Sequence, residues 1–403
     1  MLLGIRIQNF CIFNDDKAGI VLDDLLSPDQ TSSLSFSAGI TPNIPFSNLL
    51  ALIGRNASGK SLFFSALSFV SDCTTMGCST AATQHGHQGF LNLLNNPDGP
   101  MNFEFLFLIA NGKLDKSGSG DRYVSYQIEL SSDLHGRPYY FAEKIILCKM
   151  QSDGSWNQTV CLDLSDGRGT VLSGDDLITA GVSDKRISAL HSYGAIVSFP
   201  ILTAIYQEIS HWFFCNFSLQ KNGEKTTVAP GGHKHLNGNG TNAENVLDYL
   251  RSENESLYNS VMEKISDKIP GTKKVSNKLA EFFMQSPNRL FLYLLLLEDP
   301  MPRPLICVET PDMGLYHDMV DVLASEFRQY SVRHPFSQII FTTHNPYILE
   351  SMAPSEVWIF KRQEADSCNL VNIECAGAKP IVAEMYRQGV GMGAIWYAGH
   401  FDE

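Results

Sequence analysis

Eight consecutive residues form the clearest chemical pattern in this sequence of 403 residues: Gly54-Arg55-Asn56-Ala57-Ser58-Gly59-Lys60-Ser61. They match the spacing Gly-x-x-x-x-Gly-Lys-Ser, in which the glycines let backbone N–H groups converge on phosphate oxygens. The lysine of this pattern reaches the β- and γ-phosphates of a nucleotide, and the hydroxyl after it ligates Mg²⁺. We therefore expect residues 54–61 to bind nucleotide phosphates and Ser61 to bind the metal.

A second set of polar residues follows two short apolar runs nearer the C-terminus. Glu309 and Asp312 come after Leu305–Val308, and His344 comes after residues 338–341. A carboxylate at the end of a buried strand serves Mg²⁺-nucleotide sites, and a histidine there can sense the terminal phosphate. Each residue alone would also fit a helix cap, an ion pair or a structural histidine. Their order after the phosphate loop favours a site in which Glu309 binds the metal and Glu309, Asp312 and His344 act in catalysis.

The apolar pattern predicts the elements that position these residues. A strand-like run at 49–53 precedes the glycine loop, and a run of helical length at 62–70 follows it. Helical periodicity at 318–328 separates the two apolar strands, which indicates a parallel right-handed crossover. Ligands bind at the carboxyl ends of such strands. The sequence therefore predicts an α/β fold with all the polar residues above at one edge of a parallel sheet.

The remaining segments predict two further regions. Alternating apolar residues indicate antiparallel strands, and helical periodicity follows them, ending in a wholly apolar helix at 290–297. Polar, glycine-containing stretches are expected to be loops, of which the last reads as a flexible linker. The predicted strands are 4–10, 101–109, 122–130, 139–147 and 159–164, the helical stretches 175–219 and 242–269, and the loops 15–45, with short strands in it, 74–100 and 221–242.

Composition limits the classes of function. The net charge is −13, which argues against a strong DNA-binding surface of the chain's own. The nine cysteines include no Cys-x-x-Cys pair, so the pattern favours a reducing cytoplasm over a zinc or disulfide framework. No apolar run reaches the roughly 18–20 residues that span a bilayer, and the N-terminus does not resemble a signal peptide. We expect a cytoplasmic protein that does not enter a membrane.

With these motifs in place, the chain resembles the ABC-type ATPases of the RecF and structural-maintenance-of-chromosomes (SMC) branch. The resemblance is strongest to compact prokaryotic ATPases called AAA-family or abortive-infection proteins, relatives of the overcoming-lysogenization-defect (OLD) ATPases. Residues 54–61 are similar to their Walker A motif, residues 306–315 lie where Walker B belongs, and His344 lies where the switch histidine belongs. The first strand, both lobes and the C-terminal segment of the family are similar to residues 5–10, 102–126, 245–271 and 391–399.

The resemblance implies an α/β fold with an ABC-ATPase-like P-loop NTPase core, an antiparallel β lobe and a helical lobe. ATP and Mg²⁺ are the implied cofactors. The implied units are an N-terminal ATPase lobe at 1–170 with the phosphate loop, a helical lobe at 171–285 with the linker 221–242, and a C-terminal ATPase lobe at 286–403.

Three departures from the family pattern bear on catalysis. The family ends its Walker B strand with an acidic residue, a catalytic glutamate, a proline and another acidic residue, but here Thr310 stands in the glutamate's place. Losing a general base typically lowers the rate about 10²–10⁴-fold, and Asp312 is the candidate substitute. The family signature Leu-Ser-Asp-Gly-Thr corresponds to residues 284–288, where Pro287 has no N–H to donate. The spacer before that signature is also short.

The resemblance therefore implies an ATP-binding subunit that hydrolyses ATP slowly or not at all. It would serve as a nucleotide-dependent switch or scaffold in a prokaryotic anti-phage defence complex, an implication that rests on family analogy. The implied partners are further copies of the chain and a separate effector such as a nuclease, because the chain shows no nuclease motif. Two alternatives stay open: an active RecF/SMC-like ATPase in DNA repair or maintenance, and a scaffold with a relic nucleotide site.

Overall fold

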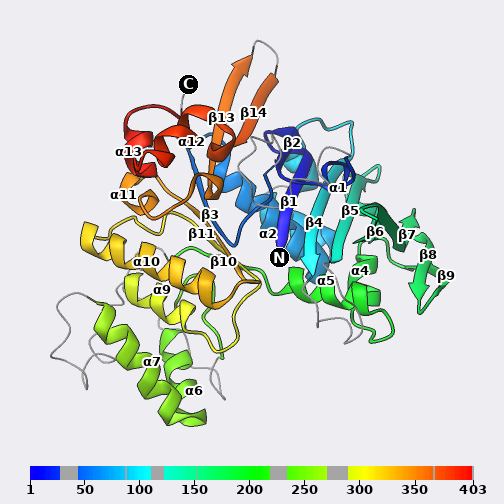
Figure 1. Cartoon of the computed structure of the whole chain (residues 1–403). Helices are drawn as coiled ribbons and strands as arrows, with labels where there is room; N and C mark the ends of the chain where they lie inside the picture. The colour runs from blue at the N-terminus through cyan, green and yellow to red at the C-terminus, as the bar shows by residue number, and fades with distance from the viewer. Residues whose placement is uncertain are drawn as a thin grey trace.

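The computed structural model describes residues 1–27, 44–86, 89–109, 122–151, 153–217, 234–269, 289–365 and 368–401. Within these ranges the chain forms two sheets with helices between and around them (Figure 1). None of the helices in the described ranges has the length and apolar character needed to cross a membrane.

The first sheet is antiparallel and has the strand order β2-β1-β4-β5-β6-β7-β8-β9. Its strands are β1 (Leu2–Phe10), β2 (Phe13–Gly19), β4 (Met101–Ile109), β5 (Arg122–Ser132), β6 (Pro138–Met150), β7 (Trp156–Ser165), β8 (Arg168–Ser173) and β9 (Asp176–Gly181).

The second sheet has the order β10-β11-β12-β3-β13-β14, and every neighbouring pair except β13 and β14 is parallel. Its strands are β3 (Leu49–Gly54), β10 (Phe213–Cys215), β11 (Leu305–Val308), β12 (Gln338–Thr342), β13 (Val357–Ala365) and β14 (Cys368–Cys375). The carboxyl ends of β3, β11 and β12 therefore meet at one edge. The predicted parallel arrangement of the apolar strands around a helix is confirmed.

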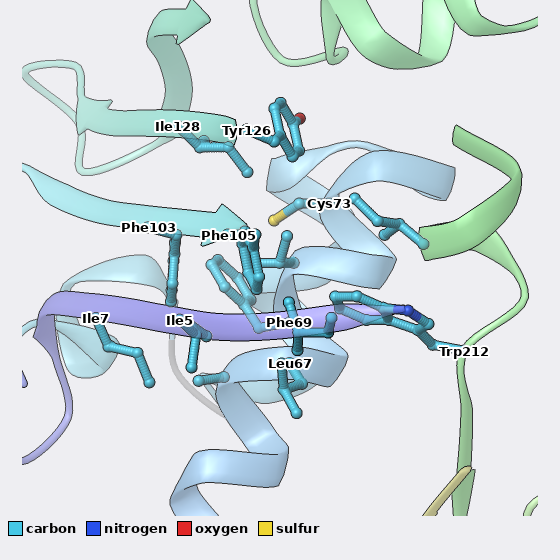
Figure 2. Packing of buried hydrophobic residues seen from close by; sticks show 14 of the residues in the cluster. Ile5, Ile7, Leu67, Phe69, Cys73, Phe103, Phe105, Tyr126, Ile128 and Trp212 are labelled. Carbon is cyan, nitrogen blue, oxygen red and sulfur yellow. The ribbon is translucent and has the colours of Figure 1, made fainter. Parts of the chain in front are cut away.

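Helix α2 (Lys60–Met76) lies between the two sheets. Its apolar side chains share one buried cluster with the inward face of the antiparallel sheet and with Leu50 and Leu52 of β3. Figure 2 shows Leu67 and Phe69 of α2 among residues of β1, β4 and β5, and the Phe69 ring centroid lies 5.7 Å from that of Phe10. Burying each such ring contributes about 2–3 kcal/mol, so this packing fixes the helix firmly.

The opposite face of the parallel sheet packs against the C-terminal helices. Because side chains alternate along a strand, Leu49, Ala51 and Ile53 face this second cluster, away from α2. The nine-residue helix α9 (Arg289–Leu297) is buried along its whole length, as its composition predicts. The remaining helices are α1 (Leu22–Leu26), α3 (Cys78–His85), α4 (Ala189–Gly194), α5 (Pro200–Ser210), α6 (Ala243–Glu253), α7 (Glu255–Lys268), α10 (His317–Arg333), α11 (Pro346–Leu349), α12 (Pro380–Arg387) and α13 (Met392–Tyr397), and the 3₁₀ turns are η2 (Phe90–Leu93), η3 (Pro354–Glu356) and η4 (Ala376–Ala378).

The α/β fold predicted from the sequence, with its P-loop core, antiparallel β lobe and helical lobe, is confirmed. Helices α6 and α7 project from the sheet region at the lower left of Figure 1. The signature-like residues 284–288 and the short spacer lie outside the described residues, as does part of the predicted linker 221–242. In the described remainder of that linker, His235 hydrogen-bonds Asp299 at 2.7 Å.

Several local predictions are wrong. The expected helical stretch 175–219 contains the strands β9 and β10. The expected loop with short strands at 15–45 begins within the short strand β2, as expected, but it also contains the helix α1, and residues 28–43 lie outside the described residues. The expected loop 74–100 contains α3 and η2. These elements are short or largely exposed, so their sequences lack the repeated apolar spacing on which the predictions rest.

A buried glutamine joins the two sheets. The Gln338 side chain at the start of β12 accepts a hydrogen bond from the Leu2 N–H at 2.6 Å and donates to the Leu2 and Ser47 carbonyls at 2.8 and 2.9 Å. The amide is fully shielded from solvent. It therefore satisfies backbone groups that would otherwise be buried without partners, at the point where β1 passes the parallel sheet.

We expect Gln338→Leu to lower the free energy of unfolding by about 3 kcal/mol, because three buried backbone groups lose their partner. Urea unfolding followed by circular dichroism measures the change. Gln329→Leu is the matched control, because Gln329 is exposed and its side chain only contacts Ser325 on the same helix. Equal stability of the two variants would contradict a joining role for Gln338.

Candidate nucleotide site

Two glycines allow the chain to turn sharply between β3 and α2. Gly54 has φ +141° and Gly59 has φ +107°, in the region that side chains disfavour. A Cβ on Gly54 would lie 2.2 Å from the Phe360 carbonyl oxygen, so only glycine lets β13 approach this closely. The loop leads directly into the first turn of α2, where backbone N–H groups without helical partners favour an anion.

Lys60 is held inside this loop. Its Nζ donates to the carbonyl oxygens of Gly54 at 2.7 Å and Arg55 at 2.8 Å, and the side chain is 6% exposed. Burial lowers the pKa of Lys60 to about 8, because the charged ammonium loses contact with water. A phosphate in the loop would supply the counter-charge that this lysine needs.

The two residues expected to bind the metal are brought together. The Ser61 hydroxyl donates to a carboxylate oxygen of Glu309, across 248 positions of sequence. The Glu309 N–H in turn donates to the Cys215 carbonyl of β10 at 3.3 Å. No group of three or more His, Cys, Asp or Glu side chains in the described ranges is arranged to hold a metal. Mg²⁺ commonly uses one or two protein oxygens and completes its shell with phosphate and water, so the Ser61–Glu309 pair fits a nucleotide-borne Mg²⁺.

Thr310 occupies a sterically disfavoured conformation. Its φ is +42°, which is unusual for a β-branched residue, and its N–H donates to Thr342 Oγ1 at 2.9 Å. Arg289, at the start of α9, donates to the Met313 carbonyl and lies 3.5 Å from the Thr310 carbonyl oxygen. These contacts fix the turn after β11. Sequence reasoning missed Arg289, because no spacing pattern marks it.

Asp312 and His344 lie near each other at this edge. Asp312 accepts a hydrogen bond from Thr343 Oγ1 at 2.9 Å. Burial raises the pKa of Asp312, while the Thr343 hydrogen bond and the charge of His344 oppose the rise. Burial and the positive charge of Lys60 lower the pKa of His344, while the charge of Asp312 opposes the fall.

The predicted residues enclose a cavity of about 220 Å³. Of the residues expected from sequence, most of the phosphate loop and His344 line it. Thr310 also lines it, whereas Glu309 and Asp312 are not among its lining residues. Four further lining residues were not predicted as site residues: Ile12, Leu62, Thr342 and Arg362. The complete lining consists of Ile12, residues 56–62, Thr310, Thr342, His344 and Arg362.

Comparison with known proteins gives partial matches. No curated protein matches the chain in sequence. A family model described as "AAA domain, putative AbiEii toxin, Type IV TA system" matches residues 288–350. That segment carries Glu309, Asp312 and His344 but not the phosphate loop, which the fold brings to it.

Among solved structures, the chain is similar to SMC head domains at 12% identity. An SMC head bound to the C-winged helix domain of ScpA aligns with a TM-score of 0.45, over 93% of this chain and 97% of that one. The SMC head of Thermotoga maritima aligns at 0.40, over 92% and 97%. A third, bound to the C-terminal domain of ScpA derived from Pyrococcus furiosus, aligns at 0.40, over 96% and 99%. The glycine loop between β3 and α2, with polar residues at the neighbouring strand ends of a parallel sheet, is the arrangement of a P-loop nucleotide-binding core.

We expect the Lys60 ammonium to titrate with a midpoint of about 8 in the ligand-free protein, against its ordinary value of 10.5. Adding Mg²⁺-pyrophosphate should move the midpoint upward, because a nearby anion favours the charged form. NMR of protein labelled with ¹³C-lysine measures both. The resonance should be missing in Lys60→Arg, and a midpoint near 10.5, or one that pyrophosphate does not move, would contradict the assignment.

Proposed function

We propose that this protein is an ATP-binding ABC-type ATPase subunit that hydrolyses ATP slowly or not at all and acts as a nucleotide-dependent switch or scaffold. The observation that carries the proposal is that Thr310, not a carboxylate, lines the cavity beside an intact phosphate loop. The phosphate loop supplies the groups that nucleotide binding needs. Among the described residues that line the cavity, no carboxylate is present to activate water.

ATP with Mg²⁺ is the ligand that fits the residues present. The loop offers convergent N–H groups, and the Ser61 and Glu309 oxygens meet beside Lys60. Lys60 is a buried cation with no carboxylate at hydrogen-bond distance among the described residues. Bound ATP would be held by residues 54–61. Mg²⁺ would neutralise phosphate charge, with Ser61 and Glu309 as its protein ligands.

Slow hydrolysis follows from the chemistry of Thr310. A hydroxyl has no basicity near neutral pH and does not take a proton from an attacking water as a carboxylate does. Thr310 also stays in place at a disfavoured φ, which the surrounding contacts to Thr342 and Arg289 maintain. Because such strain is characteristic of ligand-contacting positions, Thr310 is proposed to contact bound nucleotide or its water.

Asp312 is the alternative base. Burial raises its pKa toward the range in which a general base works. Its side chain is engaged with Thr343, however, and it does not line the cavity. The proposal therefore assigns Asp312 to holding the turn and His344 to the terminal phosphate.

The proposed setting is a prokaryotic anti-phage defence complex. The matched family description names a toxin of a type IV toxin–antitoxin system, which favours a defence setting over DNA maintenance. The net charge of −13 further disfavours a motor that grips DNA by itself. The proposal includes a homo-oligomer and a separate effector, possessing a nuclease or another toxic activity, that responds to the ATP-bound form.

We expect the purified protein to bind ATP and release phosphate slowly, and Thr310→Glu to release it about 10²-fold faster or more, because a carboxylate then faces the cavity. Calorimetry and a phosphate-release assay on the same preparations measure binding and turnover. Lys60→Ala should abolish binding, and Asp312→Ala should leave the low rate unchanged. Ordinary turnover in the parent that Asp312→Ala removes, or turnover stimulated by DNA, would instead favour the active repair-type ATPase.

A further inference from the structure

Arg362 stands at the mouth of the phosphate loop, although no sequence motif marks it. It lies on β13, and its Nη1 is 3.5 Å from the Ala57 carbonyl oxygen. The side chain lines the 220 Å³ cavity that holds the loop, together with His344. It also lines a neighbouring cavity of about 700 Å³, again with His344. Arg362 and His344 therefore mark the place where the two cavities join.

The position of Arg362 is fixed by the sheet. Strand β13 pairs in parallel with β3, with Phe360 opposite Gly54. The Gly54 Cα lies so close to Phe360 that a Cβ would be 2.2 Å from its carbonyl oxygen. Arg362 is only two residues further along this tightly held strand, and it shares a strand face with Phe360. Phe360 packs on the side that α2 covers. Arg362 is thus held on the same side of the sheet as the start of α2.

The charges in this region favour an anion. The two cavities share Asn56, Ala57, Ser58, His344 and Arg362, and among the described residues no aspartate or glutamate lines either of them. Arg55 and Lys361 add further positive charge to the larger cavity. Arg362 forms no ion pair with any carboxylate of the described ranges. The net charge of the chain is −13, yet the Arg362 guanidinium has no carboxylate partner in the described ranges. Its planar set of N–H donors is therefore well suited to bind phosphate oxygens.

The part of a nucleotide that Arg362 can reach is the end of its phosphate chain. In this loop type Lys60 reaches the β- and γ-phosphates. His344 follows β12 at the strand ends where Glu309 and Asp312 also lie. Because Arg362 and His344 line the same two cavities, the phosphate that faces the strand-end residues also faces Arg362. That phosphate is the terminal one.

We infer that Arg362 binds the terminal phosphate of ATP from within the same chain and is the residue by which the protein distinguishes ATP from ADP. The inference rests on the proposed nucleotide-binding function. It adds a source of discrimination that needs no second subunit, which matters because Pro287, at the signature-like position, has no N–H to offer a partner's phosphate.

Titration calorimetry of the full chain with Mg²⁺ and either AMP-PNP, a non-hydrolysable ATP analogue, or ADP tests the inference. We expect Arg362→Gln to weaken AMP-PNP binding about 30-fold, because a charge-assisted bidentate contact is lost, and to change ADP binding less than about threefold. The contact between Arg362 and the Ala57 carbonyl forms without a ligand, and its loss would affect both nucleotides alike, so it does not explain a selective effect on AMP-PNP. Arg168→Gln is the matched control, because it makes the same substitution at an exposed position on β8 that lines neither cavity, and it should change either affinity less than about threefold.

The outcomes separate this inference from the function on which it rests. If Lys60→Ala leaves binding intact, the proposed function fails. If Lys60→Ala abolishes binding but Arg362→Gln weakens both ligands equally, or neither, the nucleotide site stands and the role of Arg362 is overturned. An equal effect of Arg168→Gln and Arg362→Gln on AMP-PNP would also overturn it, since general charge would then explain the loss. Thermal unfolding of each variant confirms that it is folded.

Discussion

The burial of α2 between two sheets is the constraint on which the site depends. The helix contacts the antiparallel sheet on one side and β3 on the other, so its first turn has little freedom to move. Lys60 and Ser61 belong to that first turn. The Ser61 hydroxyl can therefore meet Glu309, which comes from a strand that pairs with β12 and not with β3. A site assembled from positions so distant in sequence needs a rigid helix start as its reference point.

Because the start of α2 is rigid, the positive charge of Lys60 is held in the phosphate loop at a cost in free energy. Lys60 loses hydration on burial, and its charge also lowers the pKa of His344. Arg362 adds another cation at the loop's mouth without a carboxylate partner in the described ranges. Folding therefore places the Lys60 charge where water no longer stabilises it, beside the exposed charge of Arg362. An anion bound here relieves that cost, and it stabilises the folded chain in proportion to its affinity and concentration. Such coupling is the physical basis for a ligand that acts as a switch.

Sequence reasoning succeeded where the signal is local and repeated. The phosphate loop carries a fixed spacing, and β4 matches its prediction because apolar residues alternate along 101–109. The strand-end positions of Glu309 and His344 followed from two apolar runs. It failed at β9, whose side chains are mostly exposed, and at β10, which is three residues long. Neither offers enough apolar positions to reveal its period.

The contacts that sequence could not predict depend on tertiary proximity. Arg289 and Arg362 bear on the site only because α9 and β13 pass beside the turn after β11 and the phosphate loop. Gln338 reads as a polar residue before an apolar run, yet it joins β12 to β1. A prediction made from a single sequence places such polar residues on the surface, because most polar side chains are exposed.

The strained and buried features of the site argue against a relic. Thr310 is held at φ +42°, Lys60 is a buried cation, and the Arg289 Nε finds no hydrogen-bond partner within the described part of the chain. Each of these features lowers stability by roughly 1–3 kcal/mol relative to a relaxed alternative. A scaffold without a ligand would gain stability by replacing them, for example with glycine at 310 or methionine at 60. Thr310 and Lys60 both line the cavity, and their presence there is explained if a bound nucleotide compensates for their cost.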